Sequence, residues 1–253
     1  MYKISKDIKI GKTVNQIEII PTGDWHLGSV NCNRRKLKEY LEYIRITPNC
    51  YLIGMGDLVD CILPKDKRYD ASGDFRNLDE LKQETLELLK PIRDKIIVLL
   101  TGNHEIKLQK EGYGDPIKWL CSELKVPYGG FSCFIKIHAI PDTHRKSLII
   151  FAHHGFFSGR KRGSKINNIE DLSAYWDADI FLAGHSHDIF SSRKVKIGWA
   201  GSRDLLFINT GSFVETASWR TSNYSEIHGF PPQRLGVVKV KWYPRTGRFY
   251  GTD

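Results

Sequence analysis

The sequence predicts an α/β protein in which helices flank a β-sheet. Short apolar runs of strand length alternate with longer segments whose apolar residues recur at helical spacing. Repeated strand–helix order favours a sheet covered by helices. A polar motif rich in Gly, Asp and His follows most of the runs, and in such folds ligand sites gather beyond the carboxyl ends of strands. We expect one domain over residues 1–253, because a chain of this length can bury a substantial core.

The first part of the chain alternates strands and helices. Short apolar runs predict strands over 16–21, 50–55 and 96–100. Apolar residues at helical spacing predict helices over 33–45 and 78–89, the second of them ending near Pro91. The intervening residues 61–76 mix Pro, Lys, Asp, Arg and Gly, which is typical of an exposed loop.

The rest of the chain continues the alternation. Helices are expected over 115–125 and near 168–176. Strands are expected over 131–139, 147–152 and 180–183, and near 205–209 and 236–242. No internal repeat or linker divides this pattern, so it supports a single α/β domain.

The chain carries a formal net charge of +9, with 41% hydrophobic and 26% charged residues. The hydrophobic and charged fractions are ordinary for a globular protein. The excess of positive charge favours a polyanionic partner, most simply DNA or RNA, although a basic surface can also serve only to keep a protein in solution.

The five cysteines include no Cys-x-x-Cys pair. An odd number without this spacing is typical of free thiols in a reducing compartment and argues against a disulfide framework. The first residues lack the apolar stretch of a signal peptide, and no run approaches the ~18 apolar residues that span a bilayer. We therefore expect a cytoplasmic protein without a membrane segment.

Five short polar motifs stand at the ends of apolar runs. They are Gly23-Asp24-Trp25-His26, Gly56-Asp57, Gly102-Asn103-His104-Glu105, His153-His154-Gly155 and Gly184-His185-Ser186-His187. Asp, Asn and His supply the oxygen and nitrogen ligands that divalent first-row metals accept. Side chains two residues apart lie on one side of an extended segment, so Asp24 and His26 can reach a single ion. Together the motifs predict a two-metal site that attacks phosphate esters.

In this order, the motifs resemble the signature of the calcineurin-like metallophosphoesterase superfamily. That signature is Asp-x-His, Gly-Asp, Gly-Asn-His-Asp/Glu, a lone His and Gly-His-x-His, and every element is present between residues 23 and 187. Each motif alone is weak, but the whole signature is specific. The resemblance implies a four-layer α/β/β/α sandwich. A weaker resemblance, carried by a basic segment and the C-terminal part, is to superfamily members encoded in bacterial viruses.

The resemblance also implies a role for each motif residue. One ion would be held by Asp24, His26 and His187, the other by Asn103, His153 and His185, with Asp57 bridging them. Two ions ~3.5–4 Å apart would lower the pKa of a bridging water, and the hydroxide formed would attack phosphorus in line. His104 would bind no metal but would protonate the leaving oxygen.

The fourth motif leaves two histidines open as the ligand. His153 and His154 are neighbours, and a strand sends neighbouring side chains to opposite faces, so only one of them can reach the metal. Several branches of the superfamily place one variable residue between the ligand and a Gly or Pro, which favours His153. Other branches place the ligand directly before Gly, which would favour His154. We take His153 as the expected ligand.

The donor set does not select one metal. Mixed nitrogen and oxygen ligands admit Mn, Fe, Ni, Co or Zn, and we expect manganese. Two further carboxylates, Asp60 and Glu105, adjoin the motifs and could orient the histidines or simply make surface salt bridges. We assign neither of them a role.

Two segments bear on the substrate. The basic segment 158–165 follows the fourth motif closely, so Arg160, Lys161, Arg162 and Lys165 could hold phosphates beside the cleaved one, or could form a solvated turn. The aromatic residues within 212–235 could form a cap over the site or could pack into the core.

The function expected from these features is metal-dependent hydrolysis of a phosphodiester, with DNA or RNA as the candidate substrate. The alternatives are a phosphomonoesterase acting on phosphoproteins or small phosphates, and a binding module that keeps the fold without the chemistry. Retention of Asp57, Asn103 and His104 favours hydrolysis, because non-catalytic relatives typically lack some of these groups.

Overall fold

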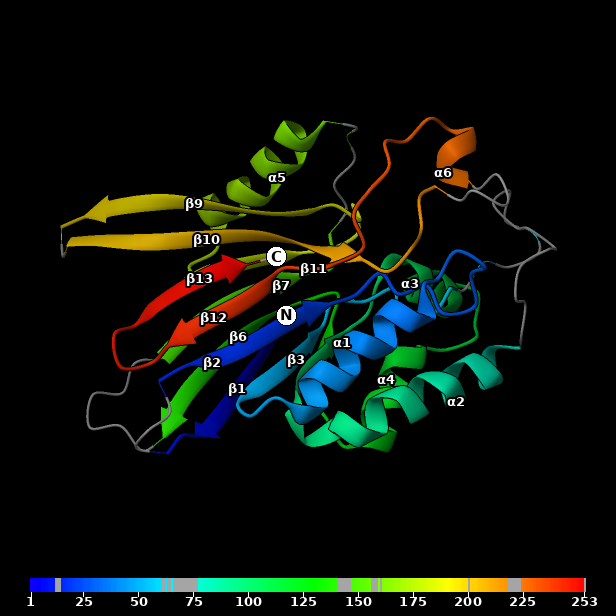
Figure 1. Cartoon of the computed structure of the whole chain (residues 1–253), viewed down its shortest axis with the longest axis horizontal. Helices are drawn as coiled ribbons and strands as arrows, with labels where there is room; N and C mark the ends of the chain where they lie inside the picture. Colours follow the sequence, from blue (N-terminus) through cyan, green and yellow to red (C-terminus); the bar gives the residue numbers. More distant parts are fainter. Residues whose placement is uncertain are drawn as a thin grey trace.

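Two β-sheets pack face to face between two layers of helices (Figure 1). The computed structural model describes residues 1–11, 15–60, 62, 65, 77–140, 147–155, 159, 161–199, 201–217 and 224–252. The four layers confirm the predicted α/β/β/α sandwich.

The six-stranded sheet has the order β13-β12-β2-β3-β4-β5. Its strands are β2 (Ile17–Thr22), β3 (Cys50–Gly54), β4 (Ile96–Leu100), β5 (Tyr128–Gly130), β12 (Lys239–Tyr243) and β13 (Arg248–Thr252). Strands β2 to β5 run parallel, β12 extends the sheet antiparallel to β2, and β13 pairs antiparallel with β12. The carboxyl ends of β2, β3 and β4 therefore lie side by side, which brings the first three motifs to one edge.

The seven-stranded sheet has the order β1-β6-β7-β8-β10-β11, with β9 paired to β10. Its strands are β1 (Tyr2–Lys9), β6 (Ser132–Ile140), β7 (Ser147–His153), β8 (Ile180–Ala183), β9 (Ile189–Gly198), β10 (Gly201–Ser212) and β11 (Gly236–Val237). Strands β7 and β8 are parallel neighbours, so the last two motifs also meet at one edge.

The core has three parts that match the four layers. Isoleucines from both sheets, among them Ile19, Ile53, Ile150 and Ile180, fill the space between the sheets. The outer face of the six-stranded sheet is covered by α1 (Arg34–Ile46), α2 (Leu78–Leu89) and α4 (Pro116–Leu124). The outer face of the other sheet is covered by α5 (Arg162–Tyr175), where Ile169 packs on phenylalanines of the strands.

Most of the elements expected from the sequence are present, with two local differences. Helix α2 ends at Leu89 as expected, but Pro91 then lies in a 3₁₀ segment, η1 (Lys90–Lys95), because proline fits the first turn of a helix. Helix α5 begins six residues before the expected 168. Its first turns show no apolar stripe, since only Lys165 and Ile169 are buried along the helix.

Several elements were not expected. They are the strands β1, β5, β9 and β13 and the helices α3 (Asn103–Lys110) and α6 (Tyr224–Ile227). Strand β1 alternates apolar and charged residues and pairs in parallel with β6. This alternation is typical of a half-buried strand, so the period was visible in the sequence.

Two of the predicted segments lie largely or partly outside the described residues. The expected loop 61–76 is described only at residues 62 and 65, and the cap segment 212–235 lacks residues 218–223. Within the cap segment, α6 lies on the side of the molecule to which the motif-bearing strand ends point (Figure 1). Among the described residues, no helix has the length and apolarity to cross a bilayer.

Candidate metal centre

The first group of candidate ligands consists of Asp24, His26 and His187. One ligand atom from each lies within 4.8 Å of the others. His26 Nε2 is 3.3 Å from His187 Nε2, and His187 Nε2 is 3.6 Å from Asp24 Oδ1. This carboxylate oxygen is buried and accepts no hydrogen bond from any described residue. A buried acceptor without a donor is costly, and a cation beside it would remove the cost.

The second group consists of Asp57, His154 and His185, with the same 4.8 Å limit. His154 Nε2 lies 3.4 Å from Asp57 Oδ2 and 2.9 Å from Asn103 Oδ1. The other ring nitrogen of His154 lies 2.7 Å from the carbonyl oxygen of Met55, so Nδ1 carries the proton in the neutral ring and Nε2 is available to a metal.

Asp57 contacts both groups. Its Oδ2 lies 3.9 Å from His26 Nε2 in the first group and 3.4 Å from His154 Nε2 in the second. Its Oδ1 accepts a 2.9 Å hydrogen bond from the backbone N–H of His104. The carboxylate is thus fixed by one oxygen and faces both groups with the other. This is the arrangement that a bridging ligand requires.

Charge and burial oppose each other across the cluster. Burial disfavours the charged forms, but the hydrogen bond to Asp60 and the nearby carboxylates raise the pKa of His26 to about 9. Burial is likewise outweighed at His154, mainly by Asp57, and its pKa is also raised to about 9. Burial raises the pKa of Asp24 to about 7, and burial with the neighbouring positive charge of His154 lowers that of His185 to about 4.

Most of these ligand loops adopt strained backbone. Among the described residues, five of the seven non-glycine residues with positive φ are motif residues, with φ between 49° and 65°: Asp24, His26, Asp57, His185 and His187. Such angles are uncommon outside glycine and persist only where the surroundings impose them. The strained residues cluster at the site. The spacing of the motifs in the sequence did not predict this strain.

Two glycines allow the loops to approach one another. Gly56 has φ +89°, and a Cβ there would lie 2.5 Å from the backbone nitrogen of Gly102. A Cβ on Gly102 would lie 2.1 Å from Asp57 Oδ1. Any side chain at either position would push the Asp57 loop away from the loop that carries Asn103 and His104.

Asp60 lies between two histidines. Its Oδ1 is 3.2 Å from His26 Nδ1 and 3.0 Å from His104 Nδ1, although His104 is not aligned for a hydrogen bond. Burial opposes the charge on Asp60, but the two imidazoles outweigh it and hold the pKa of this carboxyl well below its usual range. Asp60 therefore orients one candidate ligand and one candidate acid, a role that the sequence suggested but did not select.

Glu105 binds backbone and not histidines. It is fully buried, and its two oxygens accept N–H groups from Asp57, Leu58, Val59 and Gly102 at 2.7–3.2 Å. Burial and the charge of Asp57 raise its pKa to about 8. The carboxyl joins the Asp57 loop to the start of α3 and thereby sets the position of Asp57 relative to His104.

The structure places His154, and not His153, in the cluster. Leu148, Ile150 and Ala152 of β7 face the space between the sheets, and the same alternation continues to His154. His153 turns to the other side, where its ring lies against Phe131 and its Nδ1 accepts the Gly155 N–H at 2.8 Å. This geometry runs against the expected ligand His153 and puts its neighbour in that place.

The basic residues that follow this motif are placed in different surroundings. Arg160 lies outside the described residues. Lys161 is exposed at the start of α5. Arg162 is held by Asp188, with Nη2 2.9 Å from Oδ1, so its guanidinium supports the loop that follows His187. The charge of Lys161 faces solvent, whereas Lys165 is buried and its Nζ lies 3.3 Å from Ser186 O.

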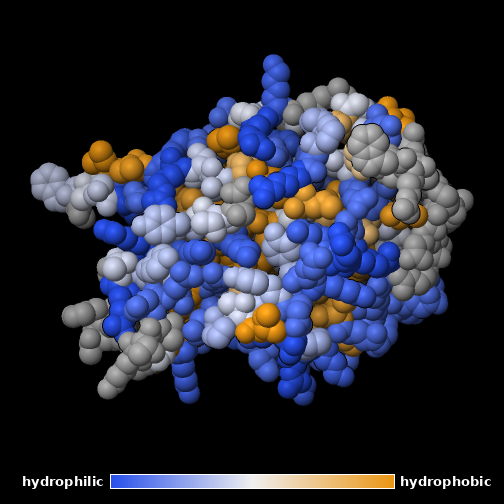
Figure 2. Space-filling view, viewed as in Figure 1, coloured by the Kyte–Doolittle hydropathy of each residue, from blue (hydrophilic) through white to orange (hydrophobic). Residues whose placement is uncertain are grey.

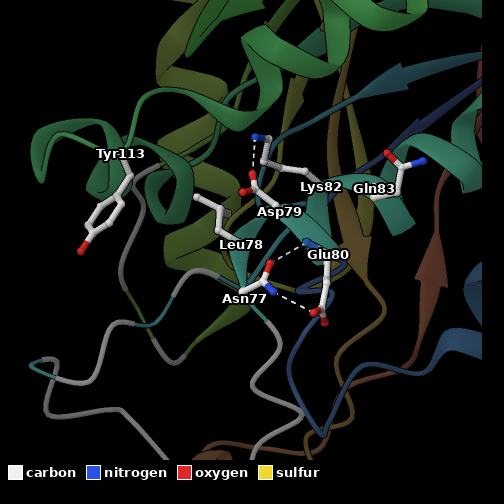
Figure 3. A pocket seen from close by; sticks show the side chains of 7 residues that line it. All are labelled: Asn77, Leu78, Asp79, Glu80, Lys82, Gln83 and Tyr113. Atoms are coloured by element: carbon white, nitrogen blue, oxygen red, sulfur yellow. Dashed lines mark hydrogen bonds and ion pairs between the residues drawn. The ribbon is translucent and has the colours of Figure 1, made fainter.

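A separate depression lies beside α2 and is lined by Asn77 to Glu80, Lys82, Gln83 and Tyr113 (Figure 3). Asn77 exchanges hydrogen bonds with Glu80, and Lys82 pairs with Asp79 at 2.8 Å. None of the lining residues belongs to the motifs. The polar groups of the depression bond to one another, so it presents no counterpart to the unpaired oxygen of Asp24.

A family model described as calcineurin-like phosphoesterase matches residues 17–189. A comparison with curated proteins gave no match. Three similar solved structures are a metallophosphoesterase from Sphaerobacter thermophilus, a predicted phosphoesterase from Streptococcus pneumoniae and Vps29 from Entamoeba histolytica complexed with Zn²⁺.

The three structures are 12%, 14% and 13% identical to this chain, in that order, with TM-scores of 0.42, 0.38 and 0.39. The alignments cover 94%, 95% and 93% of this chain and 88%, 100% and 97% of theirs. Likenesses at this level carry no argument about the chemistry of this site, whereas the family match spans all five motifs.

Proposed function

The chain belongs to the calcineurin-like phosphoesterase family, and from this premise we propose that it hydrolyses phosphodiesters with two divalent metal ions. The observation that carries the proposal is the position of Asp57. One oxygen of this carboxylate faces two separate groups of ligand atoms, each compact enough for one ion. Paired ions with a shared ligand are typical of enzymes that cleave phosphate esters.

The distances support two ligand sets. Asp24, His26 and His187 would hold one ion, and Asn103, His154 and His185 the other, with Asp57 shared. His154 thus takes the place first given to His153. The buried and unpaired oxygen of Asp24 fits a cation, as does the mixed nitrogen and oxygen donor set. We propose manganese, and the same donors would accept Fe, Ni, Co or Zn.

Bound divalent ions would activate water and neutralise charge on the phosphoryl oxygens. The protein's own part in the reaction centres on His104. Its ring packs edge-on to that of His26 with centroids 4.5 Å apart, and it is buried beside the first ligand group. From there it can donate a proton to the leaving oxygen, while Asp60 keeps the ring oriented.

The preference for a diester rests on charge. The net charge of +9 and the exposed Lys161 near the cluster suit a substrate with further phosphates beside the cleaved one. DNA or RNA fits this description. The four described cysteines are free and buried, which suits a reducing compartment, so we propose a cytoplasmic location.

The direct experiment compares a diester with a monoester. Protein loaded with manganese is offered bis-p-nitrophenyl phosphate and p-nitrophenyl phosphate, and the series is repeated with the other cations. We expect the higher kcat/KM for the diester, and almost none after substitution Asp57→Asn. A preference for the monoester would replace the proposal with a phosphomonoesterase, and no turnover with any cation would favour a binding module.

A second experiment addresses nucleic acid. If lysines and arginines neutralise phosphates, affinity for an oligonucleotide should fall steeply as salt rises. Affinity that is absent, or that does not change with salt, would remove DNA and RNA from the proposal while leaving the hydrolytic chemistry untouched.

A further inference from the structure

Strands β9 and β10 form a long hairpin that extends away from the body of the molecule on the side opposite α6 (Figure 1). Ten residues of β9 pair with β10 in continuous register from Ile189 to Gly198. Within the described part of the chain, β9 pairs with no other strand, so its outer edge keeps free N–H and C=O groups. Such an edge is a template for another strand.

An apolar stripe runs along the outer half of this strand. Val195, Ile197 and Trp199 are 59%, 83% and 106% exposed. Alternate residues of a strand share a face, so Val195 and Ile197 lie on one face of β9, and Trp199 follows in the turn at the tip. Figure 2 shows hydrophobic atoms at this end of the molecule. Clustered apolar groups on an outlying element indicate an interaction surface.

The charges of the hairpin favour a β-strand over an anionic polymer as its partner. Three of its four cations are already paired with carboxylates: Arg193 with Asp204, Lys194 with Glu170 and Arg203 with Asp177. Lys196 has no ion pair with any described residue. An anionic polymer would therefore find a single unpaired charge here, whereas a strand with apolar side chains would find a matching edge.

We propose that the hairpin edge pairs with β9 of a second copy of this chain, antiparallel and with Ile197 on the two-fold axis. In this register, Ile197 lies opposite itself, Lys196 lies opposite Gly198, and Val195 lies next to the turn that carries Trp199 of the second copy. Apolar side chains then adjoin apolar side chains, and no two lysines face each other.

Neighbouring registers of the β9–β9 pair are less stable because they place lysines opposite one another. An axis at Lys196 places this lysine opposite itself, and an axis at Val195 places Lys194 opposite Lys196 twice. Like charges directly opposite in a sheet are destabilising. Registers shifted by one residue would bring side chains of opposite faces together, because the side-chain period of a strand is two.

The surface area buried between the two hairpins determines how stable the dimer can be. Edge pairing covers the backbone and the flanks of the apolar side chains but leaves their outer face exposed. The buried area therefore falls below the ~1,200 Å² at which standard specific interfaces begin. The dimer should therefore have a Kd in roughly the micromolar range and should exchange with monomer.

The first test is sedimentation of the full chain from about 1 to about 100 µM, a range that brackets a micromolar Kd. We expect a concentration-dependent dimer for the unaltered chain and a monomer for Ile197→Glu. The matched control is Ile46→Glu, since Ile46 is 61% exposed at the end of α1 and lies outside the hairpin. This variant should dimerise like the unaltered chain.

The second test fixes the register. Ile197→Cys should form an intermolecular disulfide on mild oxidation, because a residue on the axis meets its own copy at a distance that a disulfide spans. Lys196→Cys should not, since it faces Gly198 of the second copy. Oxidation of the unaltered chain gives the background from its own cysteines.

The possible outcomes separate clearly. A monomer throughout the concentration range, a dimer that persists in Ile197→Glu, or equal crosslinking of the two cysteine variants would overturn the proposal. So would a monomeric chain that binds an oligonucleotide and loses this binding in Trp199→Ser. The measurements need neither metal nor substrate, so they are independent of the proposed hydrolysis.

Discussion

The two sides of the metal centre are built differently. The loops after β2, β3 and β4 bring Asp24, His26, Asp57, Asn103 and His104, and their backbone groups are bound by a buried carboxyl and by one another. The loops after β7 and β8 bring His154, His185 and His187, and both histidines of the second loop are only half-buried. Part of their support comes from the first side, through the bond from His185 N–H to Asp24 Oδ2 at 2.9 Å.

We therefore distinguish a preformed scaffold on the six-stranded sheet from a dependent side on the seven-stranded sheet. Asp24 N–H donates to Gly56 O, Trp25 N–H donates to Asp57 O, and Glu105 joins the third loop to these two. The six-stranded side therefore has its geometry before any ion arrives. The seven-stranded side has fewer such bonds, so we expect metal binding to order it more.

Substitution Glu105→Ala should damage the scaffold most. It leaves four buried N–H groups without an acceptor, and each such group costs about 1–3 kcal/mol when alone. Because neighbouring losses do not add fully, we expect the free energy of unfolding to fall by about 3–5 kcal/mol. Denaturant titration of the metal-free protein measures this value.

The matched control is Glu123→Ala, an exposed glutamate of α4 whose loss should change stability by less than about 0.5 kcal/mol. If Glu105→Ala were equally mild, the first side would not depend on this carboxyl, and the division between the two sides would be wrong.

On the dependent side, the decisive pair is His154→Ala and His153→Ala. The first removes a nitrogen 3.4 Å from Asp57 and 2.9 Å from Asn103, so we expect affinity for one of the two ions to fall at least about 100-fold. The second removes a ring that faces Phe131, so both ions should still bind. Metal content after dialysis against limiting manganese distinguishes them. The reverse result would restore His153 as the ligand.

The choice between these histidines shows where sequence reasoning ends. Alternation along the strand establishes that His153 and His154 face opposite ways. It does not establish which of them faces inward, because residues 148–152 are apolar on both faces of the sheet. Only the packing of Leu148 and Ile150 between the sheets decides it. When a strand is buried on both faces, its sequence does not show which face lies between the two sheets.

Of the other features of the site, some could be predicted from the sequence and others could not. The alternation of strands and helices predicted the α/β class and a site at the strand ends, and the resemblance carried by the motifs implied the sandwich. The role of Glu105 could not be predicted in this way, since a carboxylate that binds backbone N–H groups has no partner side chain in the sequence. The positive φ angles at Asp24 and His187 are likewise imposed by tertiary contacts.

Metal binding should release protons from both sides. The raised pKa values of His26 and His154, about 9 each, mean that the metal-free protein holds both protons at neutral pH. An ion must displace them, so affinity should rise with pH up to about 9 and fall about tenfold per pH unit for each proton below it. Calorimetry in buffers of different ionisation enthalpy should show at least two protons released near pH 7, to which Asp24, with its pKa raised to about 7, adds about half a proton. No dependence on the buffer would contradict the protonated state of both rings.

The smallest expected effect concerns the loop after β8. Lys165 is buried, and its Nζ lies 3.3 Å from Ser186 O and 3.5 Å from Asp188 Oδ2, on either side of His187. Lys165→Met keeps the aliphatic stem but removes both contacts, so the loop should lose support while Arg162 still holds Asp188.

We expect metal affinity of the Lys165→Met variant to fall about tenfold, or roughly 1.4 kcal/mol, with little change in the unfolding of the metal-free protein. Lys118→Met, at an exposed position of α4, is the control. If Lys165→Met instead lowered stability as much as Glu105→Ala, the loops of the seven-stranded sheet would be part of the preformed scaffold. Ordering by the metal would then have no role on that side.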